Sequence, residues 1–154
     1  RGVQGSVQGV AFGGGCGGFE VKLPPRPAPP PLETDIKADI RLRLSRKNCP
    51  DLVLWPNVKA ATPGGIQGGL GPDGSSDLIG VLAMPVVYLG RSMLIGRLFC
   101  LEVKRPGGYT DPKRKKDQDD FLTLVRELGG FGAYVRSEGE AWAAYLRARN
   151  GEDR

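Results

Sequence analysis

The first 32 residues contain too much glycine and proline to form a packed core. Residues 13–18 are a glycine tract around Cys16, and residues 24–31 hold six prolines in eight positions. Glycine-rich chain is flexible and proline-rich chain is extended, and neither buries an apolar face. We therefore expect residues 1–32 to be a disordered tail or linker, with a ligand for a proline-binding module as the less favoured alternative. One folded domain is expected over residues 33–150, followed by a short tail at 151–154.

The absence of histidine removes several classes of enzyme. The chain has 154 residues and no histidine, so catalytic triads, Cys-His dyads and histidine-ligated zinc hydrolases are excluded. Its three cysteines are far apart in sequence and show no CxxC pair, which favours a reducing compartment, the cytoplasm. No run of about 18 apolar residues predicts a membrane span. Because the sequence begins at Arg1 and not at methionine, we expect a piece of a longer reading frame.

Apolar periodicity predicts three helices. Ile36, Ile40 and Leu44 recur every four residues and predict a first helix, capped by Thr34. A second helix is expected to begin at Thr110-Asp111-Pro112 and to stop at Gly129-Gly130. A third is expected at 138–149. The apolar stripes expected on the last two helices are Phe121, Leu122, Val125 and Leu128, and Trp142, Tyr145 and Leu146.

Short apolar runs predict strands at 52–55, 77–82, 84–89, 97–104 and 132–136. Gly90 and the apolar residues 93–95 suggest a hairpin between the third and fourth of these strands. The order of elements predicts an α/β fold in which a mixed central sheet is flanked by helices. The glycine-rich loop at 62–74 is not expected to bind a nucleotide, because no lysine and no helix pattern follow it.

Glu102 and Lys104 alternate with apolar residues in the predicted strand at 97–104. Side chains at alternate positions share one face of a strand, so the carboxylate and the ammonium are expected side by side. A carboxylate can hold a divalent metal, and a lysine can position water and offset charge on a phosphate. The alternative is that both residues belong to the solvated face of an antiparallel strand.

Asp77 lies where the polar turn at 74–76 enters a strand. Mg²⁺ in proteins usually takes one or two carboxylates together with water and phosphate oxygens. Asp77 and Glu102, on neighbouring strands, are therefore candidate metal ligands. An ordinary turn residue is the alternative for Asp77.

A basic cluster follows the Glu102 strand and accounts for the net charge of +5. Cations at a helix N-terminus oppose the macrodipole, so phosphate contact is the functional interpretation. A solvated helix end is equally favoured. The cluster, which holds a single anion, Asp111, consists of Lys104, Arg105, Lys113, Arg114, Lys115 and Lys116.

These elements, in this order, resemble the virus-type replication-repair nuclease (VRR-NUC) domain of the PD-(D/E)xK nuclease superfamily. The resemblance covers about residues 33–148. It is carried by Gly-Ser-Ser-Asp-Leu-Ile-Gly at 74–80, Glu-Val-Lys-Arg-Pro at 102–106, Gln118 with Phe121 and Leu122, and Gly129, Gly130, Val135, Arg136 and Ser137.

The resemblance implies a restriction-endonuclease-like core that hydrolyses phosphodiester bonds with Mg²⁺ or Mn²⁺. Asp77 and Glu102 would be metal ligands, Lys104 would orient water, and Gln118 would support the site from its helix. In the first helix the family shows Glu-Ile-Gln, and Asp35 is the closest match here, with Glu33 and Asp39 as rivals. The family's arginine before the glycine-rich loop is missing, since Pro56 precedes Asn57.

The leading expectation is a nuclease for branched, nicked or junction DNA, in the replication or repair of a phage or prophage and in the cytoplasm of its bacterial host. Arg105, Lys113, Arg114, Lys115 and Lys116 would contact DNA. A homodimer through the apolar residues 84–95 is expected, unless that segment packs on the chain's own core. The alternatives are a non-catalytic nucleic-acid-binding module with the same fold and an assembly protein that recruits a partner through its tail.

Overall fold

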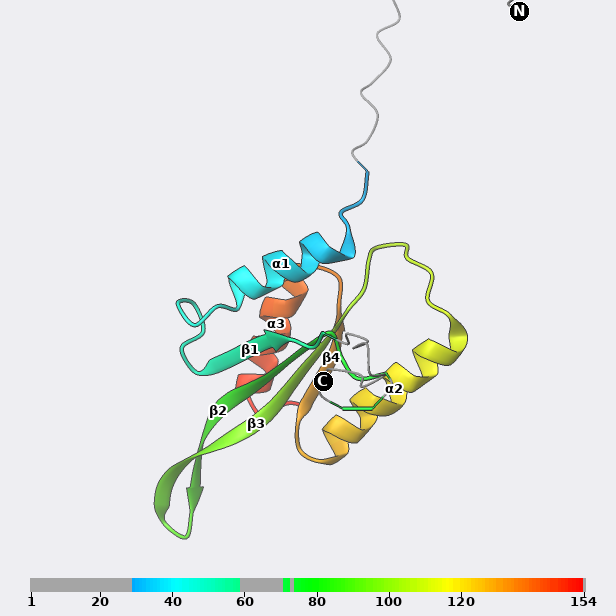
Figure 1. Cartoon of the computed structure of the whole chain (residues 1–154). Helices are drawn as coiled ribbons and strands as arrows, with labels where there is room; N and C mark the ends of the chain where they lie inside the picture. The colour runs from blue at the N-terminus through cyan, green and yellow to red at the C-terminus, as the bar shows by residue number, and fades with distance from the viewer. Residues whose placement is uncertain (1–28, 59–70, 73, 154) are drawn as a thin grey trace, which may run out of the picture.

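The computed structural model describes residues 29–58, 71–72 and 74–153. Within these residues the elements are α1 (Glu33–Arg43), β1 (Leu52–Pro56), β2 (Leu78–Tyr88), β3 (Arg91–Val103), α2 (Pro112–Glu127), β4 (Phe131–Val135) and α3 (Glu138–Arg149) (Figure 1). Most of the predicted tail, residues 1–28, lies outside the described residues, as does most of the glycine-rich loop. Residues 29–32 form no helix or strand.

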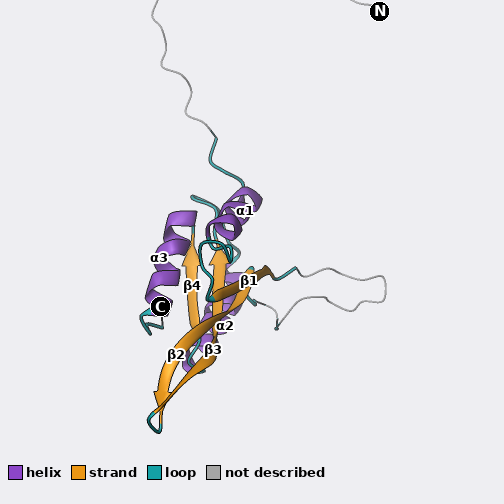
Figure 2. Cartoon of the chain, turned by 90° about the vertical axis from the view of Figure 1, so that its left-hand side faces the viewer, coloured by secondary structure: helices purple, strands orange, loops and turns teal. Residues whose placement is uncertain are grey.

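The four strands of the described residues form one mixed sheet in the order β1-β2-β3-β4. The pairs β1–β2 and β2–β3 are antiparallel, whereas β3 and β4 are parallel and are joined through α2. Helices cover both faces of this sheet (Figure 2). The predicted α/β class, with a mixed sheet flanked by helices, is therefore confirmed.

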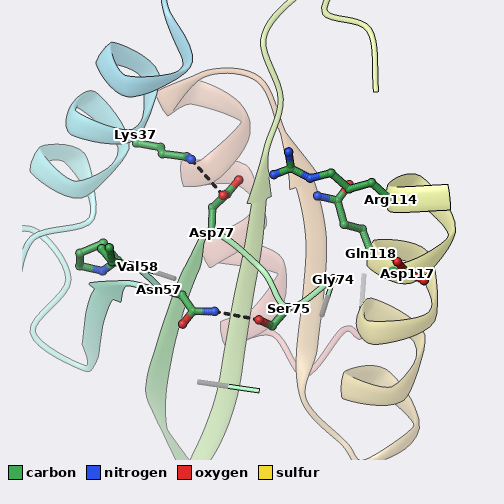
Figure 3. Close-up of a pocket in the computed structure, with 10 residues that line it drawn as sticks. Lys37, Asn57, Val58, Gly74, Ser75, Asp77, Arg114, Asp117 and Gln118 are labelled. Carbon is green, nitrogen blue, oxygen red and sulfur yellow. Dashed lines mark hydrogen bonds and ion pairs between the residues drawn. The ribbon is translucent and has the colours of Figure 1, made fainter. Parts of the chain in front are cut away.

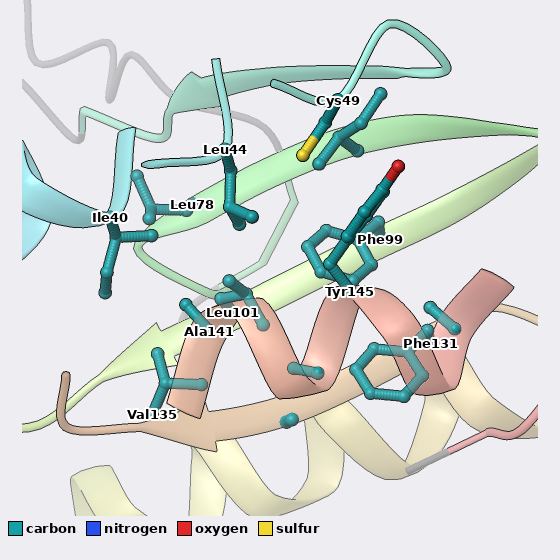
Figure 4. Packing of buried hydrophobic residues seen from close by; sticks show 14 of the residues in the cluster. Ile40, Leu44, Cys49, Leu78, Phe99, Leu101, Phe131, Val135, Ala141 and Tyr145 are labelled. Atoms are coloured by element: carbon teal, nitrogen blue, oxygen red, sulfur yellow. The ribbon is translucent and has the colours of Figure 1, made fainter. Parts of the chain in front are cut away.

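Two apolar clusters of unequal size hold the layers together. The larger lies on the face covered by α1 and α3, where Phe99, Leu101 and Val103 of β3 belong to one cluster with Ile36 and Ile40 of α1. Figure 4 shows part of this cluster, including Ile40, Phe99 and Leu101. The smaller lies under α2 and consists of Ile79, Cys100, Leu122 and Val125, with Trp55, Phe121 and Tyr134 at its edge. Alternate residues of β3 thus face opposite layers, so Glu102 shares the α2 side with Cys100.

The boundaries of α2 and α3 follow the sequence closely, whereas α1 begins without the predicted cap and ends at Arg43, before the predicted stop at Asn48 and Pro50. The Asp111 side chain accepts a hydrogen bond from the Arg114 backbone N–H at 3.1 Å, and Pro112 opens α2. Helix α3 has the predicted bounds. Thr34 does not cap α1, because the backbone carbonyl of Leu32 already accepts from residues 35 and 36 and the helix begins at Glu33.

Two residues of the predicted apolar stripes are exposed. Leu128 is 77% exposed because it is the C-cap of α2, where the chain turns away from the sheet. Leu146 is 41% exposed, since small residues on α3 pack on the sheet in its place. Those small residues are Ala141, Ala144 and Ala148.

Strands β2 and β3 form one long hairpin where separate, shorter strands were predicted. The predicted break between 82 and 84 is wrong: β2 is continuous and pairs with β3 from Leu78 to Tyr88. Pro85 is tolerated because β1 pairs with β2 only as far as Leu82, so at Pro85 one edge of β2 faces no β1 residue and a proline without N–H fits there. The hairpin turns at Leu89 and Gly90, both with positive φ (50° and 75°).

The far end of this hairpin is apolar and exposed. Val87, Leu89 and Leu94 are 74%, 84% and 71% exposed, and the two strands extend beyond the helical layers (Figure 1). The alternative that this segment packs on the chain's own core is therefore wrong for these residues.

Candidate active site

Asp77 and Glu102 lie side by side at one end of the sheet. Leu78 pairs with Leu101 in the antiparallel register, so the next residues outward, Asp77 and Glu102, are opposite one another. The Asp77 carboxylate accepts a hydrogen bond from the Val103 backbone N–H at 3.0 Å, which ties the end of β3 to the residue before β2. The predicted neighbourhood of these two acids is confirmed.

Glu102 is buried between β3 and α2, with 2% of its surface exposed. Gln118, equally buried, donates its amide N–H to Glu102 Oε1. Lys104 Nζ donates to Glu102 Oε1 at 3.1 Å and to Gln118 Oε1 at 2.6 Å. The alternative of a solvated strand face is therefore wrong for Glu102: strand and helix enclose a carboxylate, an amide and an ammonium in mutual contact.

This enclosure changes the acidity of Glu102. Burial, and after it the neighbouring Asp77 carboxylate, raises the pKa of its carboxyl group from 4.5 to about 7, against the opposing effect of Lys104 and Arg114. A carboxylate is costly to bury unless a cation accompanies it. Two carboxylates that repel one another at a sheet end therefore make a site that favours positive charge.

Helix α1 supplies one such charge. Lys37 Nζ lies 2.9 Å from Asp77 Oδ1 (Figure 3). It also lies 2.7 Å from Glu33 Oε1. Burial opposes the charge of this ammonium, but its hydrogen bonds to Glu33 and Asp77 outweigh burial and raise the pKa of Lys37. Lys37 was not singled out in the sequence, where no local pattern distinguishes it from other exposed helical lysines.

The first-helix acid nearest the site is Glu33. Glu33 lines the cavity that also contains Glu102 and Lys104, whereas Asp35 and Asp39 are exposed and line none of the cavities described below. The reason is helical phase: residues four apart share a face, so Glu33 and Lys37 point the same way, and a residue two positions along points elsewhere.

Asn57 holds the turn that leads into Asp77. Its side-chain amide donates to Ser75 Oγ and to the Ser76 carbonyl, each at 3.0 Å, and its backbone N–H donates to the Asp77 carbonyl at 2.8 Å. Asn57 therefore positions the Asp77 backbone although it follows the proline that stands in place of the family's arginine. In the sequence, Asn57 is notable only because it follows Pro56, which stands where the resembled family has arginine.

Gly74 brings the same turn against α2. It has a φ of +86°, and a Cβ atom at this position would overlap the backbone of Asp117. Only glycine allows both this conformation and this approach. The turn before β2 and the first half of α2 thus enclose the site from one side.

Three adjoining cavities open around Glu102. The first, about 560 Å³, lies between α1, the Asp77 turn and α2, and the second, about 300 Å³, lies over Glu102 and Lys104. The third, about 510 Å³, continues from Lys104 toward β4. Arg114 lines the first two, and Lys104 and Arg105 line the last two. The site is therefore open to a ligand that passes across it.

The basic residues in the first turns of α2, residues 113–116, are all exposed, but they differ in position. Lys115 and Lys116 each form an ion pair of 2.5 Å with an aspartate four residues later. Arg114 reaches the first two cavities and Lys115 the third. Lys113 and Lys116 line none of these three cavities.

The donors at the site suit a hard divalent cation bound together with water and a phosphate. Among the described residues no group of three or more acidic or cysteine side chains is arranged to hold a metal ion. Mg²⁺ commonly binds through one or two carboxylates and completes its shell with water and substrate oxygens. The adjacent carboxyl groups of Asp77 and Glu102 meet that requirement.

Comparisons with known proteins add no relative. A scan of family models, a search of curated proteins and a search of solved structures found no match to this chain. The function of the site therefore has to be inferred from its own residues.

In the part of the chain that the structure describes, no helix is both long and apolar enough to span a membrane.

Proposed function

We propose that this chain is a Mg²⁺- or Mn²⁺-dependent DNA endonuclease of the PD-(D/E)xK kind, with a restriction-endonuclease-like core. The observation that carries the proposal is the buried contact of Glu102, Lys104 and Gln118 beside Asp77. Burying charged groups in this way adds little to stability compared with apolar packing. Their position at an open cavity is what a site for phosphodiester hydrolysis requires.

Each residue has a role in this proposal. Asp77 and Glu102 would hold the metal, whose chemistry is to stabilise negative charge on the phosphate. Lys104 orients the attacking water and offsets charge on the phosphate, since its ammonium is already aimed by Glu102 and Gln118. Gln118 keeps both side chains in place from α2. Glu33 is better placed than Asp35 to add a third carboxylate.

The substrate we propose is branched, nicked or junction DNA, in phage or prophage replication or repair in the cytoplasm of a bacterial host. We expect selection of DNA by its shape, with phosphate contacts that position the strand. A second copy of the chain, bound through the exposed hairpin end, is the protein partner in this proposal.

A second candidate is a non-catalytic nucleic-acid-binding module with the same fold. The observation in its favour is the Lys37–Asp77 ion pair at 2.9 Å, which gives Asp77 a counter-ion without any metal. Such a module would bind DNA in a salt-dependent way and would need no divalent cation.

Cleavage of labelled four-way junction, flap, nicked and plain duplex DNA in Mg²⁺ or Mn²⁺ separates the two candidates. We expect the wild type to cut, and Glu102→Gln and Lys104→Met to lose at least about 100-fold in rate, as for loss of a group that stabilises transition-state charge. Glu152→Gln and Lys47→Met, at exposed positions remote from these cavities, are the matched controls. Folded wild type that binds DNA in EDTA and cuts none of these substrates would favour the binding module.

A further inference from the structure

The third cavity has the most one-sided charge of the three. Its lining is Lys104, Arg105, Gly107, Gly108, Thr110, Lys115, Tyr134 and Arg136, with no carboxylate among them. The first cavity, on the other side of Glu102, is lined by both signs: Asp77 and Asp117 face Lys37 and Arg114. On one side of Glu102, therefore, the adjoining cavity is lined by cations alone, and on the other side it is lined by both cations and carboxylates.

Two elements besides α2 shape this cationic groove. Arg105 comes from the segment after β3, and Arg136 follows β4, the strand parallel to β3. The carboxyl ends of parallel strands meet at one edge of a sheet, so the residues after β3 and β4 meet beside Glu102. Arg136 belongs to the sequence pattern at 129–137 and had no role assigned to it.

Tyr134, which lines this cationic groove, is held in a fixed position. Tyr134 pairs with Glu102 in the β3–β4 register, and its hydroxyl donates to Asp119 Oδ1 at 2.7 Å. Lys104 Nζ and Lys115 Nζ lie 5.6 Å and 5.9 Å from the centre of the Tyr134 ring. The two ammonium groups therefore lie over one fixed ring, and the Lys115 ammonium is also held by its 2.5 Å ion pair with Asp119, which a phosphate bound at Lys115 would share.

A row of cations that starts at the cleavage site suits a chain of phosphates. Arginine binds phosphate through a planar fork and lysine through a point charge. Inorganic phosphate would occupy one position, whereas the lining offers charge from Lys104 to Arg136 along the cavity. The occupant that matches several cations around one open cavity is a polynucleotide backbone.

We propose that this groove, lined by Arg105, Lys115 and Arg136, binds the backbone of one DNA strand on one side only of the phosphate that faces Glu102. This inference rests on the proposed nuclease function for its orientation. The mixed charge of the first cavity gives the strand on the other side a weaker hold. The groove thus selects substrates with a continuous strand on the cationic side.

Binding in EDTA, where a metal-dependent nuclease does not cut, measures the groove alone. We expect Lys115→Gln and Arg136→Gln each to weaken binding of a fluorescent DNA strand about threefold to tenfold near 0.1 M salt, with a salt slope shallower by about 0.7 to 0.9. Lys116→Gln is the matched comparison, since Lys116 is adjacent, equally paired and outside the groove, and a smaller loss is expected. Arg91→Gln, at the far end of the hairpin, controls for net charge.

Cleavage of substrates shortened from either side of the cut then tests the one-sided hold. Removing nucleotides on one side is expected to lower kcat/KM about tenfold or more, and equal removal on the other side to lower it less than threefold. The Arg136→Gln variant is expected to lose this difference. The proposal would be overturned by equal binding losses for Lys115→Gln, Lys116→Gln and Arg91→Gln. It would also be overturned if shortening the DNA on either side lowered kcat/KM equally. DNA binding that depends on Arg136 without any cleavage would retain the cationic groove and reject the nuclease.

Discussion

At the scale of single residues, Glu102 is the centre of the proposed active site, because it is buried in contact with two other residues of that site. Its carboxyl group contacts Lys104 and Gln118, and the Asp77 carboxylate lies opposite. Burial and the second carboxylate raise the pKa of Glu102 to about 7. The proton on this residue is therefore bound more tightly in the folded chain than in the unfolded chain.

This pKa shift predicts how the stability of the metal-free protein depends on pH. The folded state gains from the tighter proton fully below pH 4.5, and this gain is lost as the pH rises from 4.5 to about 7. Glu102→Gln cannot titrate, so its stability relative to wild type is expected to increase by up to about 3 kcal/mol between pH 4.5 and pH 8. Urea unfolding across this pH range, with Glu152→Gln as control, measures the change. Parallel pH profiles for Glu102→Gln and wild type would contradict it.

Sequence alternation was sufficient to place Glu102 and Lys104 on one face of a strand, but not to show that this face is covered. Burial depends on where α2 packs, and Gln118 reaches Glu102 only through that packing. The choice of first-helix acid was limited in the same way. Asp35 matches the family pattern best, yet Glu33 shares the helix face of Lys37, which contacts Asp77.

At the scale of elements, the layers of the domain are unequally anchored. Helix α2 packs on a cluster of four buried residues, Ile79, Cys100, Leu122 and Val125. Helices α1 and α3 share the larger cluster on the other face and also contact one another. Fewer fully buried residues hold α2 than hold α1 and α3, so we expect that less free energy is needed to detach α2 locally.

Amide hydrogen exchange tests this inequality. We expect amides of α2, such as those of Leu122 and Val125, to exchange at least about tenfold faster than those of Leu101 and Phe131, which corresponds to about 1.4 kcal/mol. Helix α3 is the matched comparison, because it is a helix of similar length on the larger cluster. Equal protection of α2 and α3 would show that the smaller cluster anchors its helix as firmly.

The elements themselves were largely predictable, since periodicity and capping residues are local signals. The bounds of α3 and the Asp111 cap of α2 follow directly from the sequence. The continuity of β2 through Ala83 and Pro85 did not, because it depends on pairing with β3. Burial of Leu128 was also predicted wrongly, since the stripe pattern does not show that the helix turns away one residue earlier.

At the scale of the whole molecule, the long hairpin separates two regions with different properties. The end of β3 carries Glu102, and its beginning, eleven residues earlier, carries the exposed apolar tip. At about 3.3 Å per residue these regions are on the order of 36 Å apart. A partner bound at the tip, as proposed, would contact the chain at this distance from the cavities around Glu102.

The proposed homodimer is tested at this tip. We expect the wild type to sediment as a dimer at micromolar concentration and the double variant Leu89→Asn, Leu94→Asn to sediment as a monomer, because contiguous exposed apolar surface is what association buries. Circular dichroism checks that the variant stays folded, and Lys47→Met is the control. A wild type that remains monomeric at all concentrations tested would reject the dimer.

The backbone at the hairpin turn gives Leu89 a further significance. Its φ of 50° is a conformation that costs a leucine about 1–2 kcal/mol and that asparagine or glycine adopts more easily. The same leucine is among the most exposed apolar side chains of the described residues. Asparagine at this position would make the isolated chain more stable and would reduce the exposed apolar surface of the hairpin tip. At position 89, the residue that would best stabilise the monomer therefore differs from the residue that would best promote self-association.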